Sequence, residues 1–269
     1  EQVSPRLTEC TSLILAVPGT YRPFREVVRI ASFAKSVDVI SSKQRPRKVV
    51  VLGSDGNEYR FLLKGHEDLR QDERVMQLFR LINACLENNP KTRKRGFKIV
   101  RYTVLPLSNN AGVIGWVENC DTLNQLIRRY RQQRDLHCDA EQRLLKAKAP
   151  DYDKLPLIHR IEVFNAIRGE TIGKDLAVML WLSSKSSDIW VQRRANFTKS
   201  LAAMSMVGYI LGLGDRHPSN IMLDRVSGRI VHIDFGDCFE VAMHRQTFPE
   251  TVPFRLTRML VLSMEASGI

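Results

Sequence analysis

The sequence has no long apolar run and no closely paired cysteines. Apolar stretches such as Leu13 to Val17 and Met206 to Leu213 are far shorter than the roughly 18 residues that a membrane-spanning helix needs. The first residues lack the basic start and long apolar centre of a secretory signal. The absence of any C-x-x-C pair argues against a disulfide framework or a zinc site and favours a reducing compartment. We expect the five scattered cysteines to be small apolar fillers: Cys10, Cys85, Cys120, Cys138 and Cys238.

Acidic residues are too few to balance the basic ones. The chain has 41 Lys and Arg against 29 Asp and Glu, which gives a formal charge of +12. Polyphosphate, nucleic acid, an anionic membrane or an acidic protein could each use this excess. The basic residues form three clusters: Lys43, Arg45, Arg47 and Lys48; Lys91, Arg93, Lys94 and Arg95; and Arg128, Arg129, Arg131 and Arg134. We expect the second and third clusters to be solvated faces.

Hydrophobic periodicity predicts a β-rich first part and a helical second part. Strands are expected at residues 11–17, 27–33, 37–40, 48–52, 58–64, 97–107 and 113–117, with Asp55-Gly56 as a hairpin turn and one helix around 75–86. From Asp121, which we expect to cap a helix, the spacing becomes helical. Helices are expected at 141–148, 157–167, 174–182 and 188–211 and from Pro253, and strands at 221–223 and 229–233. We predict an α+β fold with two lobes, 1–117 and 118–269, and a ligand site in the cleft between them.

The most informative residues lie between Gly212 and Gly236. Asn220 follows Asp215 by five positions, and Asp234-Phe235-Gly236 follows a short predicted hairpin. Protein kinases use this layout: the first Asp faces the attacking hydroxyl, and the Asn and the Asp of Asp-Phe-Gly bind magnesium. Phosphoryl transfer depends on positioning more than on covalent help, which explains why the spacing matters. The pattern therefore predicts a phosphotransferase.

Two features separate this motif from that of ordinary protein kinases. The loop reads Asp215-Arg216-His217, the reverse of the usual order, and no G-x-G-x-x-G occurs in the first part. The inverted loop resembles that of the phosphatidylinositol 3-kinase superfamily. Within it, the chain resembles the phosphatidylinositol 3-kinase-related kinases, and among these the target-of-rapamycin branch. Segments 62–74 and 212–220 carry the resemblance to the related kinases, and segments 41–48, 149–153, 204–215, 235–240 and 253–258 carry the resemblance to the target-of-rapamycin branch.

The resemblance implies a protein-kinase-like fold with an incomplete second lobe. It also implies Ser/Thr protein kinase activity in growth and nutrient signalling, with ATP and Mg²⁺ (or Mn²⁺) as cofactors. Lys64 would pair with the nucleotide phosphates and would itself be held by Glu67 or Asp72. Both acids lie near the start of a helix, so the sequence leaves this choice open.

The resemblance implies further nucleotide-binding residues. Ser42 and Gln44 resemble the segment that cradles the phosphates. The main chain from Gly115 to Val117 would hydrogen-bond the base, and Thr122 would lie at the rim of its pocket. The walls of that pocket would be formed by Leu62, Tyr102, Trp116, Val117, Met222 and Ile233.

The same resemblance assigns the reacting groups. Asp215 would accept or orient the proton of the attacking hydroxyl. His217 would stabilise charge on the transferring phosphoryl group, or else be a structural histidine of the loop. Asn220 and Asp234 would hold magnesium, which prefers oxygen ligands shared with phosphates.

Two other functions compete with a protein kinase. A phosphoinositide lipid kinase of the same superfamily would carry a basic run after Asp234, but residues 237–253 contain only His244 and Arg245 as basic groups. A basic nucleic-acid-binding module would explain the charge but not the spacing of the catalytic motif. The sequence therefore favours a protein substrate and no direct contact with nucleic acid.

The resemblance also predicts an assembly. We expect the chain to be a fragment of a much larger protein that works with a β-propeller subunit and large scaffold subunits. The propeller would dock on an insertion near residues 134–173. We expect a cytoplasmic location, with peripheral membrane association through the complex or partial nuclear location as alternatives.

Overall fold

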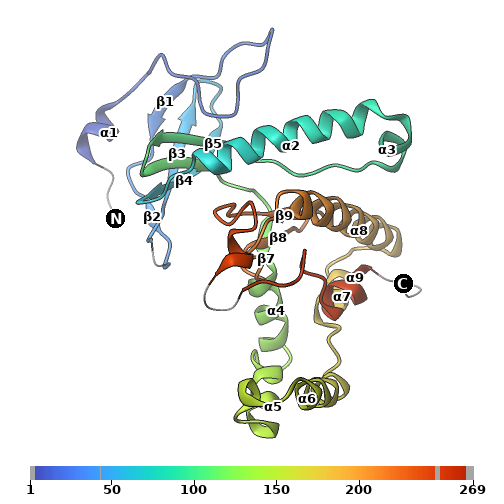
Figure 1. Cartoon of the computed structure of the whole chain (residues 1–269). Coiled ribbons are helices and arrows are strands. Elements are labelled where there is room, and N and C mark those ends of the chain that lie inside the picture. The colour runs from blue at the N-terminus through green and yellow to red at the C-terminus, as the bar shows by residue number, and fades with distance from the viewer. Residues whose placement is uncertain (1–3, 43, 246–248, 265–269) are drawn as a thin grey trace. The chain divides into compact units, whose positions relative to one another are not determined.

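The chain divides into two compact units in a computed structural model that describes residues 4–42, 44–245 and 249–264 (Figure 1). The first unit comprises Glu1–Glu118 and Asp234–Gly236, and the second comprises Asn119–Ile233 and Asp237–Ile269. Lys43 of the first basic cluster lies outside the described residues. Within the described residues, no helix combines the length and the apolar character that crossing a bilayer requires.

An antiparallel sheet forms the centre of the first unit. Its strands run in the order β1-β3-β4-β6-β5, and β2 pairs with β3. The predicted hairpin is confirmed: β3 and β4 pair directly, and Gly56 takes the left-handed backbone that such a turn requires (φ 79°). The strands are β1 (Ile30–Phe33), β2 (Asp38–Val39), β3 (Arg47–Gly53), β4 (Glu58–Gly65), β5 (Val104–Ser108) and β6 (Ala111–Gly115).

The predicted strand at residues 11–17 is wrong. The segment bonds irregularly to the chain around β1 and forms only a bridge between Ala16 and Arg29. Ser12 has a left-handed backbone (φ 52°), which interrupts an extended strand at its first residues. Ile14 and Leu15 are exposed, whereas Val17 at the end of the run is fully buried, so burial does not alternate as in a regular strand.

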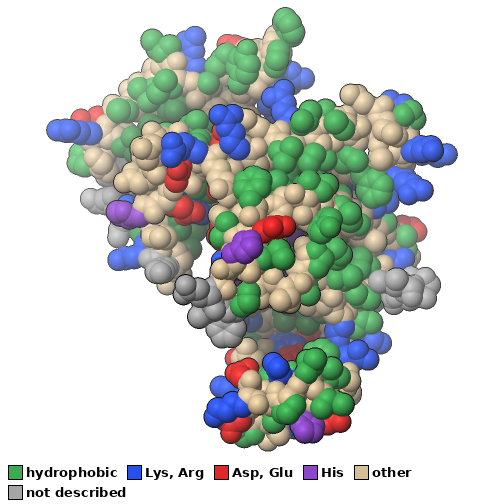
Figure 2. Space-filling view, viewed as in Figure 1, with side chains coloured by type: hydrophobic (Ala, Val, Ile, Leu, Met, Phe, Trp, Pro, Cys, Tyr) green, Lys and Arg blue, Asp and Glu red, His purple; other side chains and the backbone are tan. Residues whose placement is uncertain are grey.

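Among its described residues, the first unit also contains the helices α1 (Pro5–Glu9), α2 (Arg70–Asn88) and α3 (Pro90–Arg95). The predicted helical face of α2 is confirmed, because Val75 and Phe79 are buried and Pro90 follows its end. The short helix α3 was not expected. Its basic side chains, Arg93 to Arg95, lie in its last turn, where their positive charge interacts favourably with the helix dipole. They are exposed on the surface, as expected of a solvated face (Figure 2).

The second unit combines a small sheet with helices. Strands β7 (Cys120–Thr122), β8 (Ile221–Asp224) and β9 (Ile230–His232) are antiparallel, in the order β7-β8-β9. The core joins Phe197 and Leu201 of α8 to Leu176 and Leu180 of α7 and to β8. The helices are α4 (Leu123–Gln132), α5 (Ala140–Lys148), α6 (Leu157–Glu170), α7 (Asp175–Leu182), α8 (Ser187–Ile210) and α9 (Arg258–Met264), with short turns η1 (Tyr152–Lys154) and η2 (Val241–His244).

Two expected helix starts lie elsewhere. Thr122, not Asp121, caps α4, because its hydroxyl accepts from Gln125 N while the Gln125 side chain bonds back to Thr122 N. Asp121 instead belongs to β7, opposite Leu223. The last helix begins at Arg258 rather than near Pro253.

Candidate active site

The second unit holds the loop that contains Asp215. This loop runs beside the chain that follows Asp-Phe-Gly: Gly214 N donates to Asp237 O at 2.8 Å, and Glu240 N donates to Gly212 O at 3.0 Å. Gly212 has φ 54°, and a Cβ there would lie 2.6 Å from Glu240 N. A side chain at position 212 would therefore force the two segments apart.

Asp215 and Asn220 lie together, as their spacing predicts. The Asn220 side-chain nitrogen donates to the Asp215 carbonyl at 3.0 Å and to Asp215 Oδ2 at 3.3 Å. Asn220 is buried, and Asp215 holds a left-handed backbone (φ 57°). Such conformations cost about 1–3 kcal/mol and gather at functional sites. Because the amide nitrogen of Asn220 is turned to Asp215, its carbonyl oxygen is the atom that it can offer to a cation.

His217 lies at the edge of this arrangement. Its Nδ1 accepts a hydrogen bond from Ser219 N at 3.2 Å, so a neutral ring carries its proton on Nε2. Nε2 lies 3.9 Å from Asp215 Oδ2, and the side chain is half exposed. This placement suits donation to a nearby oxyanion.

Sequence reasoning missed Arg216. Its buried guanidinium donates to Gly214 O at 2.8 Å and to Ile233 O at 2.9 Å, which ties the loop to the end of β9. Arginine suits this task because its fixed fork of donors reaches several carbonyls at once. The available signal was an arginine between two functional residues in a loop whose carbonyls have no helix or sheet to satisfy them.

His232 is buried in β9 without a polar partner. Neither ring nitrogen has a hydrogen-bond partner among the residues that the structure describes. Burial, with a smaller contribution from Arg216, lowers the pKa of His232 to about 3. The ring is therefore neutral at pH 7.

Acid is expected to destabilise the second unit through His232. Its folded-state pKa lies below the unfolded value of 6.5, so its contribution is complete above pH 6.5 and is lost as pH falls toward 3. At pH 5 the loss should be about 2 kcal/mol, at 1.36 kcal/mol per pH unit. Hydrogen exchange of β8 and β9 at pH 7 and pH 5, corrected for intrinsic rates, measures it. His232→Leu should flatten this pH dependence, and an unchanged dependence would contradict the assignment.

The first unit holds Lys64 and its acidic partner. Lys64 Nζ lies 2.9 Å from Glu67 Oε1, so of the two open candidates Glu67 makes the contact. Asp72, in the first turn of α2, is buried and instead accepts from Phe235 N at 3.3 Å. Lys64 still acts on Asp72 through its charge.

The start of α2 also holds the Asp234-Phe235-Gly236 backbone. The Gln71 side-chain nitrogen donates to Phe235 O at 2.7 Å and to Gly236 O at 3.1 Å. The Phe235 ring meets Phe79 edge-on, with centroids 5.4 Å apart. Asp234 itself has a left-handed backbone (φ 62°). Gln71 was not identified as a site residue from the sequence. The only signal there was its position next to Asp72.

The pKa of Asp72 is raised to about 6, chiefly by burial. The folded state therefore favours the protonated acid, and stability falls as pH rises from about 4 through 6. The loss reaches about 3 kcal/mol, because each pH unit between the folded and unfolded pKa values is worth about 1.36 kcal/mol. Asp72→Asn should remove this dependence and slow hydrogen exchange in the first turn of α2 at pH 7. A variant that keeps the wild-type dependence would show that another group titrates.

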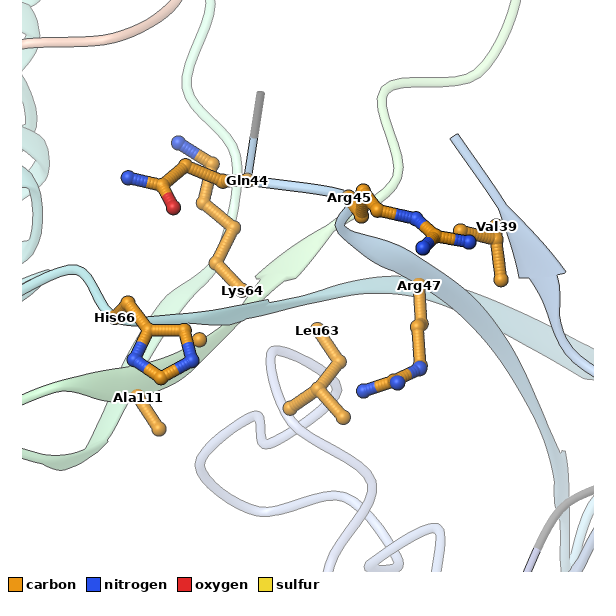
Figure 3. Close-up of a pocket in the computed structure, with 9 residues that line it drawn as sticks. Val39, Gln44, Arg45, Arg47, Leu63, Lys64, His66 and Ala111 are labelled. Carbon is orange, nitrogen blue, oxygen red and sulfur yellow. The ribbon is translucent and has the colours of Figure 1, made fainter. Parts of the chain in front are cut away.

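A cavity of about 290 Å³ lies at the end of β4 in the first unit. Gln44 and Lys64 lie on one side of it, and Arg47 and Leu63 lie on the other, as alternation along paired strands dictates (Figure 3). Gln44 and Lys64, both predicted to bind phosphates, are thus brought together. Ser42 lies at an exposed bend nearby in the sequence, but not among the residues that line this cavity.

The residues expected to bind adenine divide between the units. In the first, Leu62 lies on β4, and the Lys48 ammonium lies 4.9 Å from the centre of the Trp116 ring. Tyr102 and Val117 are half buried there. In the second, Thr122 on β7 lies opposite Met222 on β8, and Ile233 follows β9.

Two of the main-chain N–H groups that were expected to bind the nucleotide base at residues 115–117 already donate to the protein itself. Gly115 N donates to Thr103 O at 2.7 Å, and Trp116 N donates to Arg60 O at 2.9 Å. These two donors are therefore engaged by the protein itself. Within the described residues the N–H of Val117 makes no such bond, so it is the donor of this segment that remains for a nucleotide base.

Asn220 of the second unit and Asp234 of the first unit each carry an oxygen ligand suited to a divalent cation. Across the part of the chain that the structure describes, no group of three or more His, Cys, Asp or Glu could hold a metal ion. One amide oxygen from Asn220 and the carboxylate of Asp234 are hard ligands of the kind that Mg²⁺ prefers. Phosphate oxygens are the further ligands that such a site requires.

Comparison with known proteins identifies the class. The family model of the phosphatidylinositol 3- and 4-kinases matches residues 58–269, and the chain belongs to this family. Nucleotide and divalent-metal use are implied by that membership.

Particular members of the family are more similar to the chain. The serine/threonine-protein kinase TOR of Oryza sativa is 62% identical over 99% of this chain, and that of Arabidopsis thaliana is 61% identical over 100%. The chain spans only 11% of the length of either relative.

Solved structures confirm the kinase-like α+β fold. The FAT and kinase domain of CtTel1 superposes with a TM-score of 0.75 at 32% identity, over 94% of this chain and 18% of that chain.

Proposed function

We propose that the chain is the catalytic part of a Ser/Thr protein kinase of the target-of-rapamycin type. Its role is to transfer the γ-phosphoryl group of ATP to protein hydroxyls in growth and nutrient signalling. The contact between Asn220 and Asp215 is the observation that carries this proposal. The contact supports the proposal, because phosphoryl transfer requires a proton acceptor, the proposed role of Asp215, beside a cation ligand, the proposed role of Asn220. The high identity to TOR kinases supports the choice of branch.

Each residue of the site has its own role in the proposed phosphoryl transfer. Asp215 orients the attacking hydroxyl and accepts its proton. His217 donates from Nε2 to the charge that develops on the phosphoryl oxygens. Lys64, whose Nζ pairs with Glu67 Oε1 at 2.9 Å, binds the α and β phosphates. Asn220 and Asp234 would hold Mg²⁺, which would neutralise phosphate charge there.

A protein substrate is favoured over a phosphoinositide by the segment after Asp234. In residues 237–253, two acidic residues engage positive or polar groups of the same unit: Asp237 pairs with Arg245, and Glu250 accepts from Asp215 N. Arg245 is thereby partly neutralised, and His244 is the other basic residue of this stretch. An inositol phosphate would find little positive charge there.

The test is phosphoryl transfer by the complete protein to a panel of Ser/Thr peptides and to phosphatidylinositol vesicles. We expect ATP- and Mg²⁺-dependent transfer to peptides and none to lipid. Asp234→Ala, which removes a metal ligand, should abolish the transfer. Lipid phosphorylation without peptide phosphorylation would establish the lipid kinase instead. Salt-sensitive binding of RNA or DNA without nucleotide binding would establish a nucleic-acid module.

The assembly and location are part of the proposal. Protein substrates, a β-propeller subunit and large scaffold subunits are the partners, and the propeller docks on the segment around α5 and α6. Leu157, Ile158, Ile161 and Phe164 of α6 are exposed, which supports a protein contact there. The protein works in the cytoplasm and reaches membranes through its complex. Co-purification with a propeller subunit, lost in Ile158→Asp, tests the contact.

A further inference from the structure

Glu250 reaches the main chain of Asp215. Its Oε1 accepts a hydrogen bond from Asp215 N at 2.7 Å, a short distance for a charge-assisted bond. Glu250 is half buried, and its own N donates to Ala242 O at 3.1 Å. The main chain of Glu250 is therefore bonded to Ala242, and its carboxylate is bonded to the main chain of Asp215.

The contact falls where the loop is least tolerant of change. Asp215 has φ 57°, a left-handed backbone that aspartate enters more readily than most residues but that still costs energy, so surrounding contacts stabilise it. The preceding residue, Gly214, has no room for a side chain, since a Cβ there would lie 2.2 Å from Ala242 Cβ and 3.3 Å from Glu250 Oε2. Ala242 fills the space beside the loop, and Glu250 supplies the acceptor that its strained residue needs.

We propose that Glu250 is a positioning residue that holds the Asp215 backbone in its working conformation. It acts through the main chain of Asp215 rather than on substrate. The inference rests on the proposed kinase function. It adds that the far end of the segment after Asp-Phe-Gly, and not only its first residues, sets the geometry of the catalytic loop.

A glutamine should replace Glu250 better than an alanine does. The glutamine amide oxygen can still accept from Asp215 N, although without the negative charge. Alanine leaves this donor without its acceptor and leaves the left-handed backbone unsupported. The predicted order of activity is therefore wild type, then Glu250→Gln, then Glu250→Ala.

The experiment compares these variants in the complete protein, with peptide as phosphoryl acceptor. Glu250→Ala should lower kcat per active site about 10-fold to 100-fold, as expected when a bond to a strained loop is lost. KM for ATP should stay within about 2-fold, because the Lys64 contacts are untouched. Glu250→Gln should recover most of kcat. Glu87→Ala and Glu87→Gln, at an exposed position on α2, are matched controls that should behave as wild type.

A second readout does not depend on activity. Hydrogen exchange of the peptide containing the Asp215 amide should rise at least about 10-fold in Glu250→Ala and little in Glu250→Gln. Unchanged exchange, or full kcat in the alanine variant, would overturn the positioning role. A drop in folded protein with unchanged kcat per active site would also overturn it. A wild-type protein without phosphoryl transfer contradicts the proposed function instead, and the exchange measurement still decides the role of Glu250.

Discussion

Alanine in place of Asp215 is expected to lower kcat about 10²-fold to 10⁴-fold, the range for loss of a positioned general base. The carboxylate is the group that can take the hydroxyl proton, and alanine has no acceptor. Asn220 would also lose the side-chain oxygen to which its amide donates at 3.3 Å. Steady-state kinetics of the complete protein with peptide and ATP measure the effect. KM for ATP should change little, because the loss belongs to the transition state.

An asparagine at position 215 tests whether the effect comes from the lost proton acceptor or from the lost side-chain volume. Asp215→Asn keeps the size of the side chain and an oxygen that can accept from Asn220. It does not accept a proton, so kcat should fall nearly as far as with alanine. Asp188→Ala, at an exposed position in the first turn of α8, is the control and should keep its activity. If Asp215→Asn retained wild-type kcat, Asp215 would not be the base.

Loss of the Arg131 side chain is expected to destabilise the start of the second unit by about 3 kcal/mol, the lower end for breaking a buried ion pair. Its guanidinium donates to Glu141 at 2.6 and 2.8 Å, to Asp175 at 2.7 Å and to Cys138 O at 2.8 Å. Arg131→Ala would leave these acceptors without their donor. We expect the lower end of the range of destabilisation because the Glu141 side chain is 36% exposed, and water screens an exposed ion pair.

Hydrogen exchange of α4, α5 and the N-terminus of α7 in the complete protein measures this loss. Arg128→Ala is the matched control, since Arg128 lies on the same helix and is exposed. Its effect should stay within about 0.5 kcal/mol. Arg131→Lys should be intermediate, because an ammonium keeps the charge but not the fork of donors. Equal exchange in Arg131→Ala and Arg128→Ala would show that the network does not hold α5.

Arg131 also shows where sequence patterns are insufficient. Clustered with Arg128 and Arg129, it was expected to lie on a solvated face, yet it is buried. Its partners Glu141 and Asp175 are distant in sequence, and no local pattern connects them. Long-range ion pairs depend on how helices pack, which periodicity does not specify.

Most elements were predictable because their signals are local. Asp55-Gly56 marks a turn, and the spacing of Val75 and Phe79 marks a helix face. Strand β7 was missed because three residues are too few to show alternation. The choice of helix cap failed for a related reason, since Asp121 and Thr122 are both good caps and tertiary pairing with β8 decided between them.

The site was predictable where spacing is short. Asp215 and Asn220 meet because a tight loop joins them, and Lys64 meets Glu67 because only a turn separates them. Gln71 and Arg216 could not be assigned from the sequence, because each binds carbonyl groups that fold up against it from elsewhere in the chain. Side chains that satisfy main-chain groups follow no fixed spacing, so Arg216 was marked only by its place between Asp215 and His217 in a loop.

The ammonium of Lys48 over the Trp116 ring has a consequence for pharmacology. A flat inhibitor that stacks on this indole must displace the cation and forfeit about 0.5–1 kcal/mol of attraction. Lys48→Met removes that competition, so stacking compounds should bind the variant about 2-fold to 5-fold more tightly. Titration calorimetry with a planar inhibitor would measure the difference. Substitution at Lys48 is thus a route to a drug-hypersensitive allele rather than a resistant one.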